Sequence, residues 1–275
     1  MWLAVDIGGT KTLLAVFDKK GIVVEELKFP TPQDYDEFLE MFERQYELLK
    51  TRHFQAGCVA VPGRLDRDLG KLVSLGNLPW ENEWIVRDLE RITNCPIVIE
   101  NDAKLAGLSE AILVIKKFKR TLYVTISTGI GTSLITNGVI DHGMQDMEGG
   151  QMMLVHRGKV KKWESFASGK AISKKYGMRA SDINDPEIWK DISRDFAIGF
   201  IDLIAVIQPD AIIIGGGVGS HFKKYGDMLI AELKKYETPI VPIPPILPAK
   251  RPEEAVVYGC FELVKATYGH TVKAA

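Results

Sequence analysis

The chain has 275 residues, which suggests roughly two domains at about 150 residues per domain. Its hydrophobic content of 46% and charged content of 26% are typical of a soluble globular protein. The formal net charge of −1 gives no basic surface for nucleic acid and no polybasic segment for a membrane. We therefore expect neither nucleic acid nor a membrane as a partner.

The sequence also predicts a cytoplasmic protein with reduced thiols. A strand-like segment begins at Trp2 with no sign of a secretory leader. The most apolar later stretch, Phe196–Ile207, is shorter than the roughly 20 residues of a membrane span. The three cysteines are scattered and odd in number, which favours free thiols: Cys58, Cys95 and Cys260.

The first part of the chain predicts three strands joined by short turns, followed by alternating helices and strands. Predicted strands cover Leu3–Ile7, Thr12–Phe17, Ile22–Phe29, Gly57–Val61 and Pro96–Ile99. Apolar residues at helical spacing predict helices over residues 35–49, 85–92 and 104–115.

After the basic segment Lys116–Arg120, a similar order starts again. Predicted strands cover Leu122–Ser127, Thr132–Thr136 and Ala211–Ile214, with an extended, proline-rich stretch at Ile240–Ile246. Asn137-Gly138 predicts a hairpin turn. Helices are expected over residues 171–175, 187–207, 222–236 and 253–264.

Two segments of the chain share one pattern. "DIGGTKTLLAVFD" and "STGIGTSLITNGV" each read as a strand, a glycine turn and a strand, which indicates an internal duplication. We predict two α/β domains with a cleft between them. Residues 1–115 and 255–275 would form a smaller N-terminal lobe, and residues 116–254 a larger C-terminal lobe.

The glycine turns are candidate phosphate sites. Bare backbone N–H groups form an anion-binding concavity, and glycine allows a phosphate oxygen to approach closely. Thr10 and Thr12 would add hydroxyl donors, whereas Asp6 would repel a phosphate unless a divalent cation lay between them. The alternative for Gly8-Gly9 is a simple tight hairpin. Gly215-Gly216-Gly217 follows an apolar strand and is a third position for close approach to the backbone.

Two common nucleotide motifs fail on spacing. In a P-loop the lysine follows glycine directly, but Lys11 follows a threonine, and Lys170 is followed by alanine instead of serine or threonine. A dinucleotide fingerprint that starts at Gly215 would have Ser220 in place of its last glycine.

Several motifs, in register along nearly the whole chain, resemble the ROK family of sugar kinases and repressors within the actin-like ATPase superfamily. They are Asp6–Lys11, Gly63, "NLPW" at Asn77–Trp80, "ENDA" at Glu100–Ala103, Ser127–Gly131 and Gly215–Gly217. Ser127 stands where glycine is more usual. The resemblance implies a two-lobed actin-like ATPase (ribonuclease H-like) duplication.

The resemblance also implies roles for individual residues. It assigns ATP and phosphate binding to Asp6, Gly8, Gly9, Thr10, Lys11, Thr12, Thr128, Gly129, Gly131, Gly215, Gly216 and Gly217. Asp6 would serve Mg²⁺, directly or through water. Sugar binding falls to Gly63, Asn77, Asn101, Asp102, Glu148, Gln151 and Glu164. Carboxylates suit vicinal hydroxyls because they accept hydrogen bonds from two at once.

Asp102 is the expected catalytic base, which would accept the proton of the sugar's C6 hydroxyl. The bland alternative is a helix N-cap, since Asp102 precedes a predicted helix. For Glu148 and Glu164 the alternative is a solvated surface acid. Gly149-Gly150 beside Glu148 favours a loop that approaches a ligand.

The chain departs from the family pattern at Gln151, where the family usually has a histidine that contacts the sugar and ligates a structural zinc. The matching segment, His156 to Gly169, contains no cysteine. Because zinc prefers thiolate and imidazole ligands, we expect no zinc site. Gln151 could still hydrogen-bond a hydroxyl but lacks the geometry of imidazole, so the identity of the hexose stays open.

These features lead to an ATP- and Mg²⁺-dependent kinase that phosphorylates the C6 hydroxyl of a hexose, with glucose as the first candidate. The alternatives are N-acetylmannosamine, N-acetylglucosamine, fructose or allose as substrate, with ATP or polyphosphate as donor. A sugar-sensing regulator and an actin-like filament or chaperone ATPase are less favoured. By family analogy we expect a homodimer.

Overall fold

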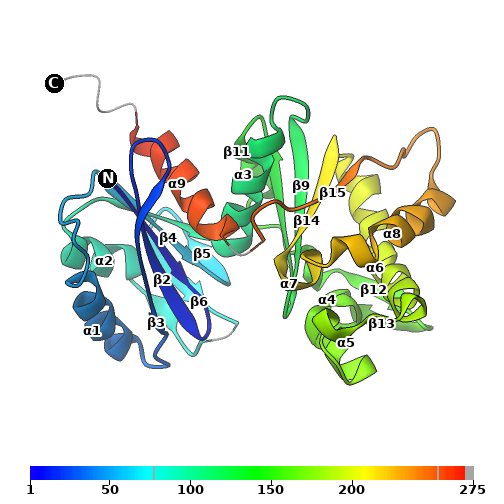
Figure 1. Ribbon diagram of the computed structural model, residues 1–275, viewed down its shortest axis with the longest axis horizontal. Coiled ribbons are helices and arrows are strands. Elements are labelled where there is room, and N and C mark those ends of the chain that lie inside the picture. The colour runs from blue at the N-terminus through cyan, green and yellow to red at the C-terminus, as the bar shows by residue number, and fades with distance from the viewer. Residues whose placement is uncertain (77, 253, 270–275) are drawn as a thin grey trace. The chain divides into compact units, whose positions relative to one another are not determined.

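A computed structural model describes residues 1–76, 78–252 and 254–269 (Figure 1). The chain forms two compact units. Unit 1 contains Met1–Ser109 and Glu254–Ala275, and unit 2 contains Glu110–Glu253. The first boundary falls inside helix α3 (Asp102–Val114), whereas the sequence analysis placed it after that helix, at residue 115. The predicted site residue Asn77 lies outside the described residues.

Unit 1 is built on a mixed sheet with the strand order β3-β2-β1-β4-β8 in the described part of the chain. Strands β1 to β3 are antiparallel neighbours, whereas β1, β4 and β8 run parallel to one another. The carboxyl ends of β1, β4 and β8 therefore meet at one edge of the sheet. The strands are β1 Trp2–Ile7, β2 Lys11–Phe17, β3 Val23–Pro30, β4 Ala56–Val61 and β8 Ile97–Asn101.

Helices cover both faces of this sheet because the strands are apolar on both sides. One face packs on α1 (Tyr35–Tyr46) and α2 (Ile85–Thr93). The other face, which carries small residues such as Ala4, Ala15 and Ala60, packs on α9 (Ala255–Tyr268) and α3 (Asp102–Val114). A separate small sheet contains β5 Arg64–Asp66, β6 Lys71–Ser74 and β7 Glu81–Glu83.

Unit 2 repeats the arrangement of unit 1. Its main sheet has the order β11-β10-β9-β14-β15, again with antiparallel strands on one side and parallel strands on the other. The internal duplication predicted from the two strand–turn–strand segments is therefore confirmed. The strands are β9 Arg120–Ile126, β10 Ile130–Thr136, β11 Val139–Ile140, β14 Ala211–Gly215 and β15 Ile246–Pro248.

The core of unit 2 forms between this sheet and α6 (Pro186–Ile207), which buries Trp189, Phe196 and Phe200. A two-stranded ribbon, β12 (Met153–His156) and β13 (Lys159–Lys162), precedes the helical segment that carries α4 and α5. The helices are α4 Glu164–Ala167, α5 Gly169–Tyr176, α7 Gly216–Gly219 and α8 Gly226–Leu233. Short 3-10 helices are η1 His142–Met144, η2 Gly149–Gln151, η3 Ala180–Asp182, η4 Phe222–Lys224 and η5 Lys234–Tyr236.

Two predicted elements of unit 2 differ from the structure. The helix predicted over residues 222–236 is broken into η4, α8 and η5, since Tyr225 leaves the helical conformation. The predicted extended stretch Ile240–Ile246 is mostly irregular, and only Ile246–Pro248 pairs with β14.

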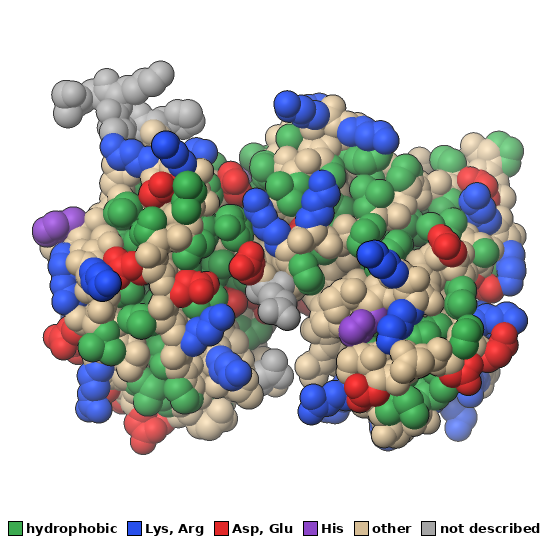
Figure 2. All heavy atoms as spheres, in the orientation of Figure 1, with side chains coloured by type: hydrophobic (Ala, Val, Ile, Leu, Met, Phe, Trp, Pro, Cys, Tyr) green, Lys and Arg blue, Asp and Glu red, His purple; other side chains and the backbone are tan. Residues whose placement is uncertain are grey.

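The visible surface of each unit mixes acidic and basic side chains (Figure 2). Within the described residues, no helix combines the length and apolar character that crossing a bilayer requires.

Candidate functional site

The first glycine turn joins β1 and β2. The Gly8 N–H donates to the Lys11 carbonyl at 2.9 Å, and the Thr10 carbonyl accepts from the Thr31 N–H at 3.1 Å. Gly9 is half-buried, whereas Thr10 and Lys11 are exposed. The tip of the turn is thus open to a ligand while its base is closed by backbone hydrogen bonds.

Thr12 does not share this exposure. It is fully buried, and its hydroxyl oxygen lies 2.9 Å from that of Thr31 on β3. Thr12 pairs with Ile7 across the ladder, so its side chain points to the face opposite Asp6. The structure therefore places the Thr12 hydroxyl inside the sheet and not at the turn surface where the sequence expected it.

Asp6 lies at the carboxyl edge of the unit 1 sheet, near the end of β1. Burial, together with the nearby negative charge of Asp102, raises the pKa of Asp6 to about 7. The neighbouring protein groups therefore offset the negative charge of Asp6 poorly. A divalent cation bound beside the carboxylate would offset that charge.

Asp102, Asn101 and Gly63 meet at the same edge, because they follow or end the parallel strands β4 and β8. The Asn101 amide donates to the Gly63 carbonyl at 3.3 Å. The Asn101 side-chain oxygen accepts from the N–H groups of Ala103 and Lys104 at 3.0 and 3.3 Å and so caps α3. One oxygen of Asp102 accepts from the Ala103 N–H at 2.7 Å. The helix cap therefore does not depend on Asp102 alone.

Burial raises the pKa of Asp102, although the Ala103 N–H and the charge of Lys104 oppose the shift. A higher pKa makes a carboxylate a better proton acceptor near neutral pH. The half-buried Asp102 side chain remains accessible to solvent.

The turn between β9 and β10 is the second glycine turn. Thr128 is exposed, and Gly129 lies against the Glu164 carboxylate, since a Cβ on Gly129 would approach Glu164 Oε2 to 2.9 Å. Gly131 belongs to β10 and is half-buried. The predicted sugar ligand Glu164 is thus brought next to a predicted phosphate turn.

Gln151 and Glu164 form a pair, with the Gln151 amide donating to Glu164 Oε1 at 2.7 Å. Glu148 is exposed just before them. Gly149 and Gly150 are required by packing on β10: added Cβ atoms would lie 2.6 Å from the Thr132 side chain and 2.2 Å from the Ile130 carbonyl oxygen. The glycines thus allow close approach to the chain's own strand, where the sequence suggested approach to a ligand.

Gly215, Gly216 and Gly217 follow β14 with different surroundings. A Cβ on Gly215 would lie 2.2 Å from the Tyr123 hydroxyl, and Gly216 has φ of +79°. A Cβ on Gly217 would meet nothing within 4 Å. Gly217 is therefore the glycine of the three with free space over it.

Gly217 and Thr128 line one pocket of unit 2, with a volume of about 330 Å³. The sequence assigned no binding role to its other lining residues, of which only Ser127 belongs to one of the family-like motifs: Ser127, Gly169, Lys170, Ser173, Arg179, Ala180, Ser181 and His221. Lys224 holds the wall that contains Ala180 and Ser181 by donating to the carbonyls of Ser181 and Ile183 at 3.1 and 2.8 Å. The signal available in the sequence was Ser168-Gly169-Lys170, where a helix begins directly after a serine cap.

The two carboxylates at the unit 1 edge are the groups best suited to a hard cation. Within residues 1–76, 78–252 and 254–269, no three or more His, Cys, Asp or Glu side chains cluster as a ready metal site.

A family model described as the ROK family matches residues 2–267, so the chain belongs to the ROK family. The chain is 27% identical over 233 residues to a putative fructokinase of Bacillus subtilis (strain 168), covering 78% of this chain and 76% of that protein. It is 23% identical over 311 residues to the glucokinase of Streptomyces coelicolor, covering 96% and 97%.

Solved structures agree with the family assignment. The ROK hexokinase of Thermus thermophilus superposes with a TM-score of 0.79 at 26% identity, covering 99% of both chains. A ROK family glucokinase of Streptomyces griseus, in complex with glucose and AMPPNP, gives a TM-score of 0.79 at 21% identity, covering 95% of this chain and 98% of that one. The chain thus has the actin-like ATPase fold that the sequence motifs implied.

Proposed function

We propose that this protein is an ATP-dependent sugar kinase that phosphorylates a hexose at the C6 hydroxyl. The observation that carries the proposal is the unit 2 pocket, in which Thr128 of one glycine segment and Gly217 of another converge. Lys170, Arg179 and His221 line the same pocket, and none of its described lining residues is acidic. A pocket of this charge and size suits the anionic chain of a nucleotide.

Asp102 is the residue that this proposal makes the base. It would accept the proton of the C6 hydroxyl while the sugar oxygen forms a bond to the γ-phosphorus and the bond to the β–γ bridging oxygen breaks, which releases ADP. Capping of α3 by Asn101 supports this role. Only Oδ1 of Asp102 accepts from a backbone N–H of α3, so Oδ2 is not needed to cap the helix.

Asp6 is the residue that would hold Mg²⁺, directly or through water, with water and phosphate oxygens completing the shell. The poorly compensated charge of Asp6 fits that assignment. When bound, Mg²⁺ would neutralise charge on the transferred phosphoryl group.

Glucose is the first candidate substrate. Gln151 stands in place of the usual family histidine, so it is the residue that would give this chain its own preference among hexoses. Its amide is engaged by Glu164, so both side chains would present a fixed set of donors and acceptors to sugar hydroxyls. The relatives named above include both a putative fructokinase and a glucokinase, so the family does not fix the hexose. Fructose, allose, N-acetylglucosamine and N-acetylmannosamine remain the alternative substrates.

The test is a coupled assay of ADP release with ATP and Mg²⁺ across glucose, fructose, allose, N-acetylglucosamine and N-acetylmannosamine. We expect one hexose, glucose first, to stimulate turnover well above the rate with water alone. A parallel series with polyphosphate in place of ATP identifies the donor. If no hexose raises the rate above the water background with either donor, the kinase proposal fails.

A further inference from the structure

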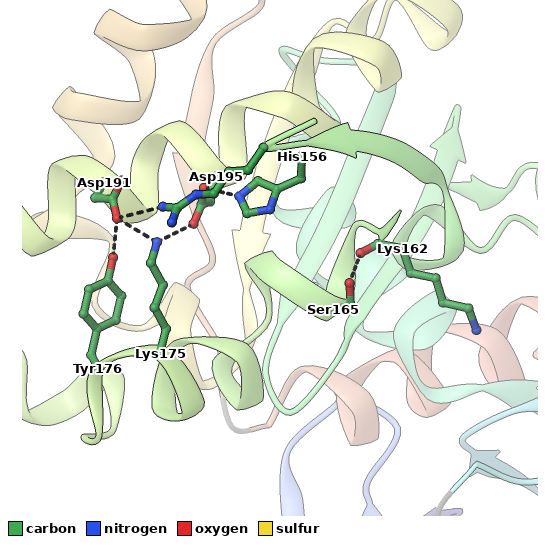
Figure 3. Close-up of polar contacts among 8 residues, drawn as sticks. His156, Lys162, Ser165, Lys175, Tyr176, Asp191 and Asp195 are labelled. Carbon is green, nitrogen blue, oxygen red and sulfur yellow. Dashed lines mark hydrogen bonds and ion pairs between the residues drawn. The ribbon is translucent and has the colours of Figure 1, made fainter. Parts of the chain in front are cut away.

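A buried carboxylate in unit 2 joins two structural arms. Asp195 on α6 is 6% exposed, and its two oxygens contact different elements. His156 Nε2, at the end of β12, lies 3.0 Å from Oδ1, and the Lys175 ammonium group, in the last turn of α5, donates to Oδ2 at 2.8 Å. Figure 3 shows Asp195 between these two partners.

The first arm leads from Asp195 to Glu164. The His156 ring stacks on the Phe166 ring, with centroids 4.1 Å apart and planes 5° apart. Phe166 and Glu164 belong to the same short helix, α4, so the stacked ring fixes the helix that carries the Glu164 carboxylate. Glu164 in turn accepts from Gln151. This is the sugar arm.

The second arm leads from Asp195 to the pocket. Lys175 also donates to Asp191 at 2.7 Å, and the Tyr176 hydroxyl donates to the same carboxylate at 2.7 Å. Burial alone would lower the pKa of Lys175, but hydrogen bonds to Asp191 and Asp195 outweigh it and raise that pKa above its usual range. The C-terminal end of α5 is thereby fixed to α6 by a permanent positive charge.

The other end of α5 is part of the pocket wall. The Gly169 N–H donates to the Ser127 carbonyl at 2.7 Å, and Gly169, Lys170 and Ser173 line the pocket. An eight-residue helix held at both ends moves as one body, so a shift at Lys175 is transmitted to Lys170. This is the nucleotide arm.

We infer that Asp195 is a positioning residue for both substrates, acting on the sugar group Glu164 through His156 and Phe166 and on the pocket wall through Lys175. The inference rests on the proposed function. A charge-assisted, buried hydrogen bond is specific in geometry, and the loss of either one leaves a buried group without its partner. The two arms diverge from one carboxylate, so their effects on the two substrates are separable.

The experiment compares three variants of the full chain by steady-state kinetics. His156→Gln keeps an N–H donor but loses the stacked ring, and we expect the KM for the hexose to rise about fivefold or more with the KM for ATP within about twofold. Lys175→Met should raise the KM for ATP about fivefold or more and leave the KM for the hexose within about twofold of the wild-type value. Asp195→Asn should raise both constants, by about tenfold, with kcat changed less.

Ser193→Ala is the matched control for lost stability. Ser193 is buried on α6 and donates to the Trp189 carbonyl at 2.8 Å, so its loss removes a buried hydrogen bond on the helix of Asp195 without touching either arm. We expect a lower thermal midpoint with both KM values within about twofold of the wild-type values. Equal effects of His156→Gln and Lys175→Met on both constants, or lower thermal midpoints with no change in either KM, would overturn the inference. If Asp195→Asn does not fold, the two arm variants decide.

Calorimetric titration with ATP separates this inference from the proposed function, because it needs no turnover. If the wild-type chain binds ATP but phosphorylates no hexose, the proposed function fails. A selective loss of ATP affinity in Lys175→Met would then still support the nucleotide arm, and unchanged affinity would overturn it. A wild-type chain that binds no ATP overturns both.

Discussion

Arg67 holds Glu100 through a two-point contact immediately before the candidate catalytic segment. Its Nε and a terminal nitrogen donate to the two Glu100 oxygens at 2.9 and 2.6 Å, and Glu100 is only 6% exposed. Glu100 Oε1 also accepts from the Asn101 N–H at 2.7 Å. The junction of β8 and α3, which carries Asn101 and Asp102, is therefore fixed by a side chain from the turn that follows β5.

Replacing Arg67 by Gln should reduce kcat about 10- to 100-fold, because a small displacement of the base is costly for proton transfer. Lysine at the same position keeps the charge but not the fork, so Arg67→Lys should recover part of the activity. Steady-state kinetics with thermal unfolding checks both. Arg64→Gln, which changes an exposed arginine in the neighbouring strand β5, is the control. Equal kinetics of the Arg64 and Arg67 variants would contradict the role of the fork.

Substituting Asp102 by Asn should leave folding and sugar binding nearly unchanged and lower kcat by about 10²–10⁴-fold, the usual cost of losing a general base. Folding is preserved because Asn101 supplies much of the cap of α3. Kinetics and calorimetric titration with the hexose measure the two effects. Asp68→Asn, an exposed acid of the same unit, should behave as wild type. Near-wild-type turnover of the Asp102 variant would remove this residue from the mechanism.

The raised pKa of Asp6 predicts a pH dependence of stability. Between about pH 4 and pH 7 the folded protein keeps a proton on Asp6 that the unfolded chain has released. The free energy of unfolding therefore falls as the pH rises through this window and is constant, for this group, above it. The effect is at most on the order of a few kcal/mol.

Asp6→Asn removes this ionisation. In Mg²⁺-free buffer, the thermal midpoint of the variant relative to wild type should rise from pH 5 to pH 7 and then level off. Asp18→Asn is an unsuitable control because backbone hydrogen bonds lower the pKa of Asp18. An exposed acid such as Asp36 serves instead. A midpoint difference that is independent of pH would show that the Asp6 pKa is ordinary.

Much of the fold was predictable because two signals are local. The strand–glycine–strand segments revealed the duplication, and the hairpin at Asn137-Gly138 has the positive φ angles, 54° and 82°, that its turn type requires. The ribbon β12–β13 was missed because its turn is Arg157-Gly158 and β13 is mostly lysine. Neither feature resembles the usual hairpin sequence.

The predicted site residues depend on facts that motifs do not contain. Side chains alternate between the two faces of a strand, and the motif does not record which face Thr12 takes. In the structure the Thr12 hydroxyl is buried against that of Thr31. The close approach of Gly150 to Ile130 is a tertiary contact between residues twenty positions apart. Arg179 enters the pocket from a segment with no motif at all. Their roles in binding stay predictions.

Gly216 and Gly217 provide a test that separates folding from binding with one methyl group. Gly216 has φ of +79°, and its Cβ would lie 2.5 Å from Thr125 Oγ1 and 2.7 Å from the Ile126 carbonyl oxygen. Gly216→Ala should therefore cost about 1–3 kcal/mol or more of stability, because both the backbone and its neighbours must shift. Gly217→Ala should change stability by less than about 0.5 kcal/mol, since its Cβ enters open space.

That open space is part of the pocket, so the added methyl group of Gly217→Ala would occupy volume that the nucleotide needs. We expect the Kd for ATP to rise several-fold in this variant while its thermal midpoint stays near that of the wild type. Thermal unfolding and calorimetric titration, carried out on both variants, give the two readouts. Unchanged ATP affinity in a well-folded Gly217→Ala protein would mean that the nucleotide does not use this wall. The pocket would then lose its place in the proposed function.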